Sequence, residues 1–555
     1  MSKNYNKKNS KKNSSSGNKR NYDKDDTKVY EKKSKSSKGL PFLTDDKHNC
    51  GDAKADINDA QWYFDPRGIV AEAARINTFL PSGRPYYSTD LNDNDDFIST
   101  VSAMVTHWLP CPGASEDGTS AMSIAGQLIF QQIRKVLNKP IADYGFADPM
   151  IAYICYLSIM TLVEEIKREY GIMNTYSTQN LSYPTGVLHA LGYSDTDIVD
   201  LRSNMADYRM QFNTLMYKLS AIYMPVETNI GMKYRWLARN LWIDHDSVKG
   251  QIYMYQATGF YEWQDTGSEG STAHYFQYYA KRTANQPMMA YKLDLLNYLI
   301  EQIRNSDSYN YLCSDMMRAF PDAKTYNWEN LVEDYMVFPA VNDDMLQQFE
   351  NVSTISKVGI TGINADVTQD VNANTVLCKP TIFLNDSLAY FINEWANDAK
   401  VNGVFTDFLG TNPSIDDIVE FTHGKHIINM SGKTIEFTPG TFSCALYLWT
   451  DIHWIQRARE TGEISYQNAD ASSYLVLNDN RAVFNMARIA ECDWHPLVFY
   501  AVEAADEGGS YQPALPFGEI DNLIRIPMAS LKRMFEAEQF ALWKVPEDVL
   551  PGKIG

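Results

Sequence analysis

The first forty residues and the remaining 515 differ so much in composition that they cannot fold by the same means. Residues 1–40 hold thirteen Lys and Arg residues against four Asp and Glu residues, a net charge of +9. Because the whole chain carries −19, residues 41–555 carry −28. Between Met1 and Lys38 the only apolar or aromatic residues are Tyr5, Tyr22, Val29 and Tyr30. Ordering such a segment costs about 1–2 kcal/mol per residue with almost no burial to offset it. We therefore predict that residues 1–47 are a disordered basic N-terminal arm.

The rest of the chain is able to bury a large core. The chain is 44% hydrophobic and 13% aromatic, with 35 Tyr and 22 Met residues, and 555 residues are too many for one compact core. The predicted fold class is mainly α with a minor β component (α+β). The predicted parts are a mainly helical domain at 48–345, an α+β module at 346–460 and a mainly helical C-terminal segment at 461–555.

Helix signals are strongest between residues 120 and 345. Asp148 followed by Pro149 indicates a helix start, and Gly171 indicates its end. The apolar stretch at 150–163 is too short and too quickly followed by charged residues for a membrane span, so it predicts a buried helix. Further helices are predicted at 288–304, 310–320, 326–337, 386–399 and 528–543.

The most regular helix signal begins at Ser194. Ser194 and Asp197 have the spacing of an N-terminal capping pair, and Pro225 ends the pattern. Apolar residues recur at spacings of 3-4-3-4-3-4-3, namely Ile198, Leu201, Met205, Tyr208, Phe212, Leu215, Leu219 and Ile222. Such a stripe indicates a helix with one buried face. The helix belongs either to the core of one subunit or to a contact across a dimer axis.

Strand signals concentrate in the 346–460 module. Short runs with high strand propensity lie at 375–378, 381–384 and 441–450. Two further runs, at 426–430 and 434–437, flank Gly432 and predict a hairpin.

The sequence offers only weak candidates for phosphate or metal binding. The run Gly432-Lys433-Thr434 lacks the earlier glycine of a phosphate-binding loop, because that position is Ile427, so a hairpin turn is predicted instead. His423 and His426 are the best candidate metal ligands, but no Cys or carboxylate cluster accompanies them. No metal and no cofactor is predicted.

Catalytic patterns are similarly sparse. The run Asp244-His245-Asp246 is interpreted as a turn or helix cap, with an acid–base group as the alternative. No nucleophile-elbow motif is present, and none of the seven cysteines forms a C-x-x-C pair, which favours assembly in a reducing compartment. The chain is therefore not predicted to be an enzyme, although a site made of distant residues stays open as an alternative.

Aromatic residues crowd between positions 253 and 279. They are Tyr253, Tyr255, Phe260, Tyr261, Trp263, Tyr275, Phe276, Tyr278 and Tyr279. Aromatic rings can stack on single-stranded bases, but a nucleic-acid groove also needs cations, and acidic residues are mixed into this segment. A core or a subunit interface is the favoured interpretation.

The basic arm is the candidate nucleic-acid-binding segment. The predicted contact residues are Lys3, Lys7, Lys8, Lys11, Lys12, Lys19, Arg20, Lys32, Lys33, Lys35 and Lys38. Neutralising phosphates releases counterions, so this arm is expected to bind without sequence preference and to lose affinity as salt rises. A solubilising spacer or a nuclear-import patch is the alternative.

Several runs outside the arm resemble capsid proteins of picobirnaviruses. The resemblance extends from the arm through most of the body and weakens after about residue 340. The runs that carry it are Asn58-Asp59-Ala60-Gln61-Trp62-Tyr63, Asp148-Pro149-Met150-Ile151-Ala152-Tyr153-Ile154, the helical region ending at Met224-Pro225, and Gln251-Ile252-Tyr253-Met254-Tyr255-Gln256-Ala257-Thr258-Gly259-Phe260-Tyr261.

The resemblance implies a virus-specific helical shell domain, to which residues 461–555 return, and a protruding domain at 346–460. It implies homodimers that self-assemble into a small icosahedral shell around viral double-stranded RNA, with the arm binding RNA nonspecifically. Some members release the arm by self-cleavage, for which Asn49-Cys50 and Asn58-Asp59 are candidate bonds.

The expected location is the virion, with assembly in the host cytoplasm. The viral polymerase is a further candidate partner, and membrane contact is expected only during entry. The alternative function is a cellular RNA-binding nucleoprotein or adaptor that does not form shells.

Overall fold

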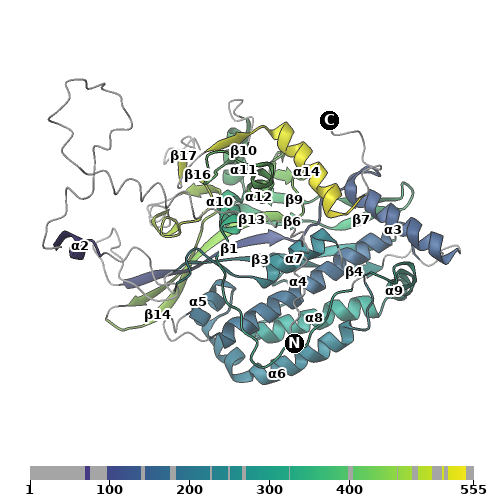
Figure 1. Cartoon of the computed structure of the whole chain (residues 1–555), viewed down its shortest axis with the longest axis horizontal. Helices are drawn as coiled ribbons and strands as arrows, with labels where there is room; N and C mark the ends of the chain where they lie inside the picture. Colours follow the sequence, from purple (N-terminus) through teal and green to yellow (C-terminus); the bar gives the residue numbers. More distant parts are fainter. Residues whose placement is uncertain are drawn as a thin grey trace, which may run out of the picture. The chain divides into compact units, whose positions relative to one another are not determined.

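The computed structural model describes residues 69–75, 97–138, 144–175, 183–224, 228–247, 250–265, 270–323, 325–397, 404–458, 460–477, 486–502, 515–517 and 523–545. The chain divides into two units, Met1–Ile76 and Asn77–Gly555. The described part of the first unit contains one short exposed helix, α2 (Ile69–Ala73). All other described elements belong to the second unit (Figure 1).

A five-stranded sheet lies at the centre of the second unit. Its order is β14 (Ile464–Asp470), β13 (Leu446–Ala458), β1 (Phe97–Leu109), β3 (Ile252–Ala257) and β2 (Trp242–Ile243). Strand β1 pairs antiparallel with β13 along its length and parallel with β3. From Thr100 to Leu109 only His107 is not fully buried, so both faces of β1 are covered. The sequence analysis predicted no element here.

Helices pack beside this sheet, and most of them lie below it in Figure 1. They are α3 (Ala121–Leu137), α4 (Asp148–Asn174), α5 (Tyr183–Ala190), α6 (Asp195–Leu219), α7 (Asn229–Arg239), α8 (Met288–Arg304) and α9 (Asp307–Ala319). Helix α4 packs against α7, α8 and strand β4 (Gly259–Asp265), and α6 packs against α8. The helices predicted at 148–171, 288–304 and 310–320 are thus confirmed, with small shifts of their ends.

Helix α4 is the central helix of this layer. It is the one helix in the described part of the chain that is long and apolar enough to cross a membrane, yet its apolar window is fully buried inside the protein. The buried core helix predicted from 150–163 is confirmed. Its C-terminal half buries charged residues as well, among them Glu164, Glu165, Arg168 and Glu169.

Helix α6 confirms the predicted capping pair and apolar stripe. Ser194 and Asp197 form a complete capping box. The stripe residues Ile198, Leu201, Tyr208, Phe212, Leu215 and Leu219 are buried. The helix kinks at Asn204, where φ is −116° and ψ is 17°, and it ends three residues before Ile222.

Two four-stranded sheets connect distant parts of the chain. One has the order β4, β5 (Ser271–Gln277), β7 (Val367–Asp370) and β8 (Thr375–Cys378). The other has the order β11 (Met430–Ser431), β12 (Thr434–Glu436), β9 (Thr381–Leu384) and β6 (Ile360–Asn364). The strands predicted at 375–378 and 381–384 are confirmed, although they join different sheets. The predicted hairpin exists but is shorter, and Gly432 adopts a φ of 64° in its turn.

The C-terminal part alternates short strands and helices. Strands β15 (Tyr474–Leu477), β16 (Val498–Val502) and β17 (Leu515–Phe517) form one sheet, and β10 (Val404–Thr406) pairs with β18 (Ile524–Ile526). The helices in and before this part are α10 (Asp343–Asn351), η4 (Lys357–Gly359), α11 (Asp386–Asn397), α12 (Ile415–Thr422) and α14 (Met528–Leu542). The helices predicted at 386–399 and 528–543 are confirmed over their described residues. The mainly helical character predicted for 461–555 is wrong for the described residues before α14, because strands predominate there.

The helix predicted at 326–337 is wrong. This segment runs along α4, and several of its backbone groups bond to the C-terminal end of that helix. The bonds within the segment, from the amides of Glu329 and Tyr335 to the carbonyls of Asn327 and Val332, form short turns and no helix. The amide of Val337 donates to the carbonyl of Gly171 (3.3 Å), and the side-chain amide of Asn174 donates to the carbonyls of Glu333 and Tyr335 (2.9 and 3.1 Å). The close approach requires glycine, because a Cβ at Gly171 would lie 2.5 Å from the side chain of Val337.

The strand predicted at 441–450 begins later and runs further, as β13, because its pairing with β1 continues to Ala458. The α+β class is confirmed. The expected predominance of helix and the division into shell and protruding domains stay predictions. Strand β13 of the predicted 346–460 module pairs with β1 of the predicted 48–345 domain.

Candidate functional site

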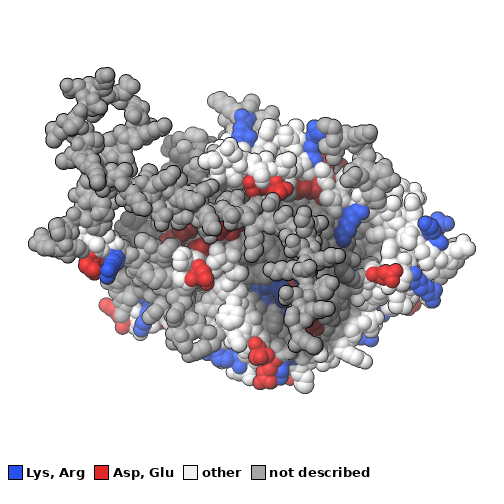
Figure 2. All heavy atoms as spheres, in the orientation of Figure 1, with Lys and Arg blue, Asp and Glu red and all other residues white. Residues whose placement is uncertain are grey.

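The predicted nucleic-acid contacts, from Lys3 to Lys38, lie outside the described residues. The candidate cleavage bonds Asn49-Cys50 and Asn58-Asp59 do as well. On the face drawn in Figure 2, the described Lys and Arg side chains lie in small groups interspersed with Asp and Glu. The candidate sites in the described part of the chain are a polar cavity, a buried cluster around Cys444 and a groove along α6.

The aromatic segment between 253 and 279 belongs to the core. Eight of its nine aromatic residues are buried, and the exception, Tyr279, is 46% exposed. Its rings pack on one another across β4 and β5, with Tyr261 and Tyr275 at a centroid distance of 5.7 Å. This arrangement confirms the core interpretation and leaves no free ring faces for stacked bases in these strands.

The polar cavity has a volume of about 750 Å³ and lies against the central sheet. Its most polar wall is formed by β1 and β13. His107 stacks on Trp449 at a centroid distance of 4.8 Å. Its Nε2 atom lies 3.2 Å from Asp451 Oδ2, and Lys357 Nζ lies 3.1 Å from the same oxygen. His453 completes this wall, and its Nε2 atom is buried without a hydrogen-bond partner among the described residues.

Burial dominates the protonation of this cavity. It lowers the pKa of His107, an effect that the carboxylate of Asp451 partly offsets, and it lowers the pKa of His453 to about 4. Burial alone would raise the pKa of Asp451, but the His107 hydrogen bond and the Lys357 charge hold that pKa well below its usual value. At neutral pH the wall therefore presents neutral imidazoles and one carboxylate neutralised by Lys357. The described lining includes no Ser or Cys that could act as a nucleophile with these histidines.

A second titratable cluster surrounds Cys444. The thiol lies 3.6 Å from His423 Nε2, and the other ring nitrogen, Nδ1, lies 3.8 Å from a carboxylate oxygen of Glu538. This order of groups is that of a thiol–imidazole–carboxylate triad. Burial, however, raises the pKa of Cys444 to about 12 and lowers that of His423 well below its ordinary value. A neutral thiol that is 1% exposed is a structural cysteine, not a nucleophile.

The other weak motifs also have structural roles. The carboxylate of Asp244 accepts the backbone amide of Gln251 (2.8 Å), so Asp244 caps a turn as interpreted. The ring of His426 packs on Phe437 at 5.5 Å, and Gly432 is a hairpin turn. No group of three or more His, Cys, Asp or Glu side chains among the described residues is arranged to hold a metal ion.

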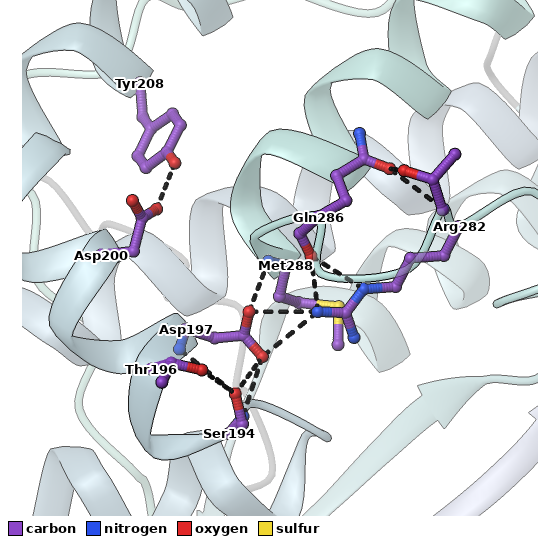
Figure 3. Close-up of polar contacts among 9 residues, drawn as sticks. Ser194, Thr196, Asp197, Asp200, Tyr208, Arg282, Gln286 and Met288 are labelled. Carbon is purple, nitrogen blue, oxygen red and sulfur yellow. Dashed lines mark hydrogen bonds and ion pairs between the residues drawn. The ribbon is translucent and has the colours of Figure 1, made fainter.

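The third feature, helix α6, is fixed at its N-terminus by Asp197 (Figure 3). Asp197 Oδ2 accepts the backbone amide of Ser194 at 2.9 Å. Asp197 Oδ1 accepts the backbone amide of Met288 at 2.9 Å and Arg282 Nη2 at 3.1 Å. Burial alone would raise the pKa of Asp197, but these hydrogen bonds and the Arg282 charge lower it. One carboxylate thus joins the start of α6 to the start of α8.

The solvent face of α6 carries large apolar side chains. Val199 is 62% exposed, Met210 63% and Tyr217 81%. After the kink at Asn204 this face becomes poor in charge. From position 210 to position 221 the exposed residues are Met210, Gln211, Thr214, Tyr217, Ser220 and Ala221, all uncharged.

A groove of about 850 Å³ runs along this face and is called the α6 groove below. It is lined by Ala206, Arg209, Met210, Asn213, Thr214, Met216, Tyr217, Ser220, Trp328 and Asn330. Its second wall is the extended segment that the sequence predicted as a helix. Asn213 holds that wall by two hydrogen bonds to the backbone of Leu331, at 2.7 and 3.2 Å. The sequence analysis found only the buried stripe, because Met210 and Tyr217 lie outside its heptad positions.

Comparisons with known proteins agree with one another. A family model described as picobirnavirus capsid protein matches residues 62–490. The capsid protein precursor of a human picobirnavirus (strain Human/Thailand/Hy005102/-) is 22% identical over 545 residues, which cover 93% of this chain and 96% of that protein. The crystal structure of the picobirnavirus capsid matches with a TM-score of 0.72 and 18% identity, covering 89% of this chain and 99% of the other.

Proposed function

Because the chain belongs to the picobirnavirus capsid protein family, whose model matches most of its length, we propose that its subunits pair and close into a small icosahedral shell that holds double-stranded RNA through the N-terminal arm. The protein is a structural capsid protein, not an enzyme, and its place is the virion. Pairing, shell geometry and RNA capture are the proposed parts.

The segregation of charge carries the proposal of RNA capture. Residues 1–20 contain seven cations and no anion, whereas residues 41–555 carry a net −28. A polyanion such as RNA is attracted to the arm and repelled by the body. An acidic wall would let packed RNA move, while many short arms would collect it during assembly.

The arm has no means of reading bases. It contains one Arg and three well-separated Tyr residues, and base-specific contacts come mostly from Arg and from polar side chains held in fixed positions. Binding is therefore expected to be nonspecific and to weaken steeply between low and physiological salt.

The test compares three full-length proteins produced recombinantly. In the first variant the seven cations between Lys3 and Arg20 become Gln. In the second, the residues of the arm are shuffled, which keeps charge and composition. Electron microscopy counts particles, and nuclease-protected RNA is measured per particle.

We expect all three proteins to form particles, the Gln variant to retain at least tenfold less RNA, and the shuffled variant to retain the wild-type load. A particle of the Gln variant with its full RNA load would refute RNA capture by the arm. Wild-type protein that stays monomeric or dimeric would refute shell formation and favour the nucleoprotein alternative.

The remaining proposals concern steps before and after assembly. Assembly in the host cytoplasm agrees with the absence of disulfides among the six described cysteines, all of which are free thiols. Arm release at Asn49-Cys50 or Asn58-Asp59 would leave a new N-terminus that mass spectrometry of purified particles identifies. Binding of the viral polymerase and membrane contact during entry stay predictions.

A further inference from the structure

The solvent face of α6 has the composition of an interface core although nothing covers it in the described structure. Tyr217 is 81% exposed and Met210 is 63% exposed, one on each side of the middle of the α6 groove. Interface cores are poor in charge and enriched in Tyr and Met. The α6 face has both properties between positions 210 and 221, whereas the exposed part of α6 before the kink includes Asp195 and Arg202.

We propose that the α6 groove is a two-fold contact in which α6 of one copy packs antiparallel on α6 of a second copy. The proposal rests on the proposed function, because only a protein that assembles with itself needs such a contact. It assigns the proposed pairing of subunits to one face of α6.

The positions of the two large side chains favour a second copy as the occupant. Met210 and Tyr217 are equally far from a point between Asn213 and Thr214. A two-fold axis at that point places Met210 of each copy against Tyr217 of the other, at both ends of a contact about 10 Å long. A contact made by the same patch on both copies must be self-complementary in this way. Methionine sulfur also packs favourably on aromatic rings.

The charges around the patch agree with the antiparallel direction. The same axis places position 207 of one copy opposite position 220 of the other, and Lys218 lies two residues before position 220. Asp207 of one copy therefore comes near Lys218 of the other. Asp207 is exposed, and the Lys218 ammonium is already held at the surface by Glu301 (3.0 Å). Antiparallel helices also place opposite ends of their dipoles together. A parallel arrangement would instead place Asp207 near Asp207 of the second copy.

The structure holds this face in position before any partner binds. The Asp197 hydrogen bonds fix the start of α6, and Asn213 fixes the second wall of the groove through Leu331. A preorganised surface loses less conformational entropy on binding than a mobile one. The extended segment at 325–331 therefore serves the groove as a built wall.

The first test is a charge substitution with a matched control. Tyr217→Asp is made in the full-length protein beside Val358→Asp, since Val358 is also 81% exposed but lies on η4, which packs against α11 and β13. Subunit pairing is measured by analytical ultracentrifugation and particle yield by electron microscopy. Near-ultraviolet circular dichroism and the thermal midpoint verify that each variant is folded.

Tyr217→Asp is expected to weaken pairing at least thirtyfold, because it removes both Met210–Tyr217 contacts of the two-fold pair and places an unpaired charge in each of them. Val358→Asp and Tyr217→Phe are expected to pair like wild type. Equal pairing of folded Tyr217→Asp and Val358→Asp proteins would overturn this inference and leave the proposed function intact. Wild-type protein that never forms particles would overturn the proposed function instead.

The second test locates the axis. Thr214→Cys places a thiol beside the proposed axis, close to the same thiol of the second copy. Gln211→Cys places a thiol at an exposed site on the same helix, but the two copies of position 211 are then offset by about 7 Å along the helix. Mild oxidation of assembled particles is expected to link Thr214→Cys subunits into disulfide dimers and to leave Gln211→Cys subunits at the wild-type background. Equal linking of both variants, or none with Thr214→Cys, would overturn the proposed axis.

Discussion

Removing the Asp197 carboxylate should loosen α6 from α8 and destabilise the fold. The side chain is 6% exposed and accepts four groups: the backbone amides of Ser194 and Met288, the Ser194 hydroxyl and Arg282. Asp197→Asn keeps the size of the side chain but gives up the charge. The NH₂ group of the Asn side chain then takes the place of one carboxylate oxygen and faces groups that are themselves hydrogen-bond donors.

The expected cost follows from these contacts. Hydrogen bonds to a charged group contribute about 1.5–3 kcal/mol each, and leaving a buried donor unsatisfied costs about 1–3 kcal/mol. Arg282 is 25% exposed and keeps two hydrogen bonds to the carbonyl of Gln286, so solvent and that carbonyl still satisfy part of its guanidinium when the carboxylate is removed. We therefore expect Asp197→Asn to reduce the free energy of unfolding by about 2–4 kcal/mol at pH 7.

The pH dependence separates this explanation from a simple packing defect. The folded-state pKa of Asp197 is lowered, so its contribution is present above the unfolded pKa of about 3.9 and is lost as pH falls below that value through the folded pKa. Chemical denaturation of both proteins at pH 7 and in steps below pH 4 measures the difference. Asp322→Asn, at an exposed position outside α6, is the control. A difference under 0.5 kcal/mol at pH 7, or one that persists unchanged at low pH, would refute the reasoning.

Two further predictions concern buried ionisable groups. Lys292 and Glu169 are an ion pair with no exposed surface, so Lys292→Met should lower the free energy of unfolding by about 3–5 kcal/mol because it leaves a buried carboxylate unpaired. Adding Glu169→Gln should recover part of that loss. Urea titration measures both variants, and a loss below 1 kcal/mol for Lys292→Met alone would contradict the prediction. Burial raises the pKa of Glu538 to about 7, and a raised folded-state pKa means stability that is present below the unfolded pKa of 4.5 and lost as pH rises through about 7. Relative to Glu538→Gln, the wild type should lose up to about 3 kcal/mol between pH 4.5 and pH 8, measured by denaturation at each pH, whereas parallel profiles would count against it.

The sequence predicted those elements whose signals are local. The capping box at Ser194 and the Asp148-Pro149 start of α4 are read directly from neighbouring residues, and both helices start where predicted. Strand β1 was missed because a strand covered on both faces shows no alternation of polar and apolar residues. The segment at 326–337 has a helix-like pattern, but its carbonyls and amides find partners on α4, which no local signal could show.

The candidate sites were harder to predict than the fold. A heptad pattern reveals the face that a helix buries within its own subunit, and in α6 it did so correctly. It says nothing of Met210 or Tyr217, which sit among uncharged polar residues on the opposite face and acquire meaning only beside the wall at Leu331. The triad-like order of His423 near Cys444 was likewise invisible, because these residues meet only in the fold.

A subunit that must stay soluble before it assembles limits how apolar such a face can be. Large contiguous apolar patches on free proteins promote aggregation, so a closing interface has to use few large side chains and rely on shape. The α6 face fits this limit: two large apolar residues stand about 10 Å apart with Thr214 and Asn213 between them, and charged residues begin on either side. Its strength therefore depends on matching the same patch on a second copy, where both large side chains are covered at once.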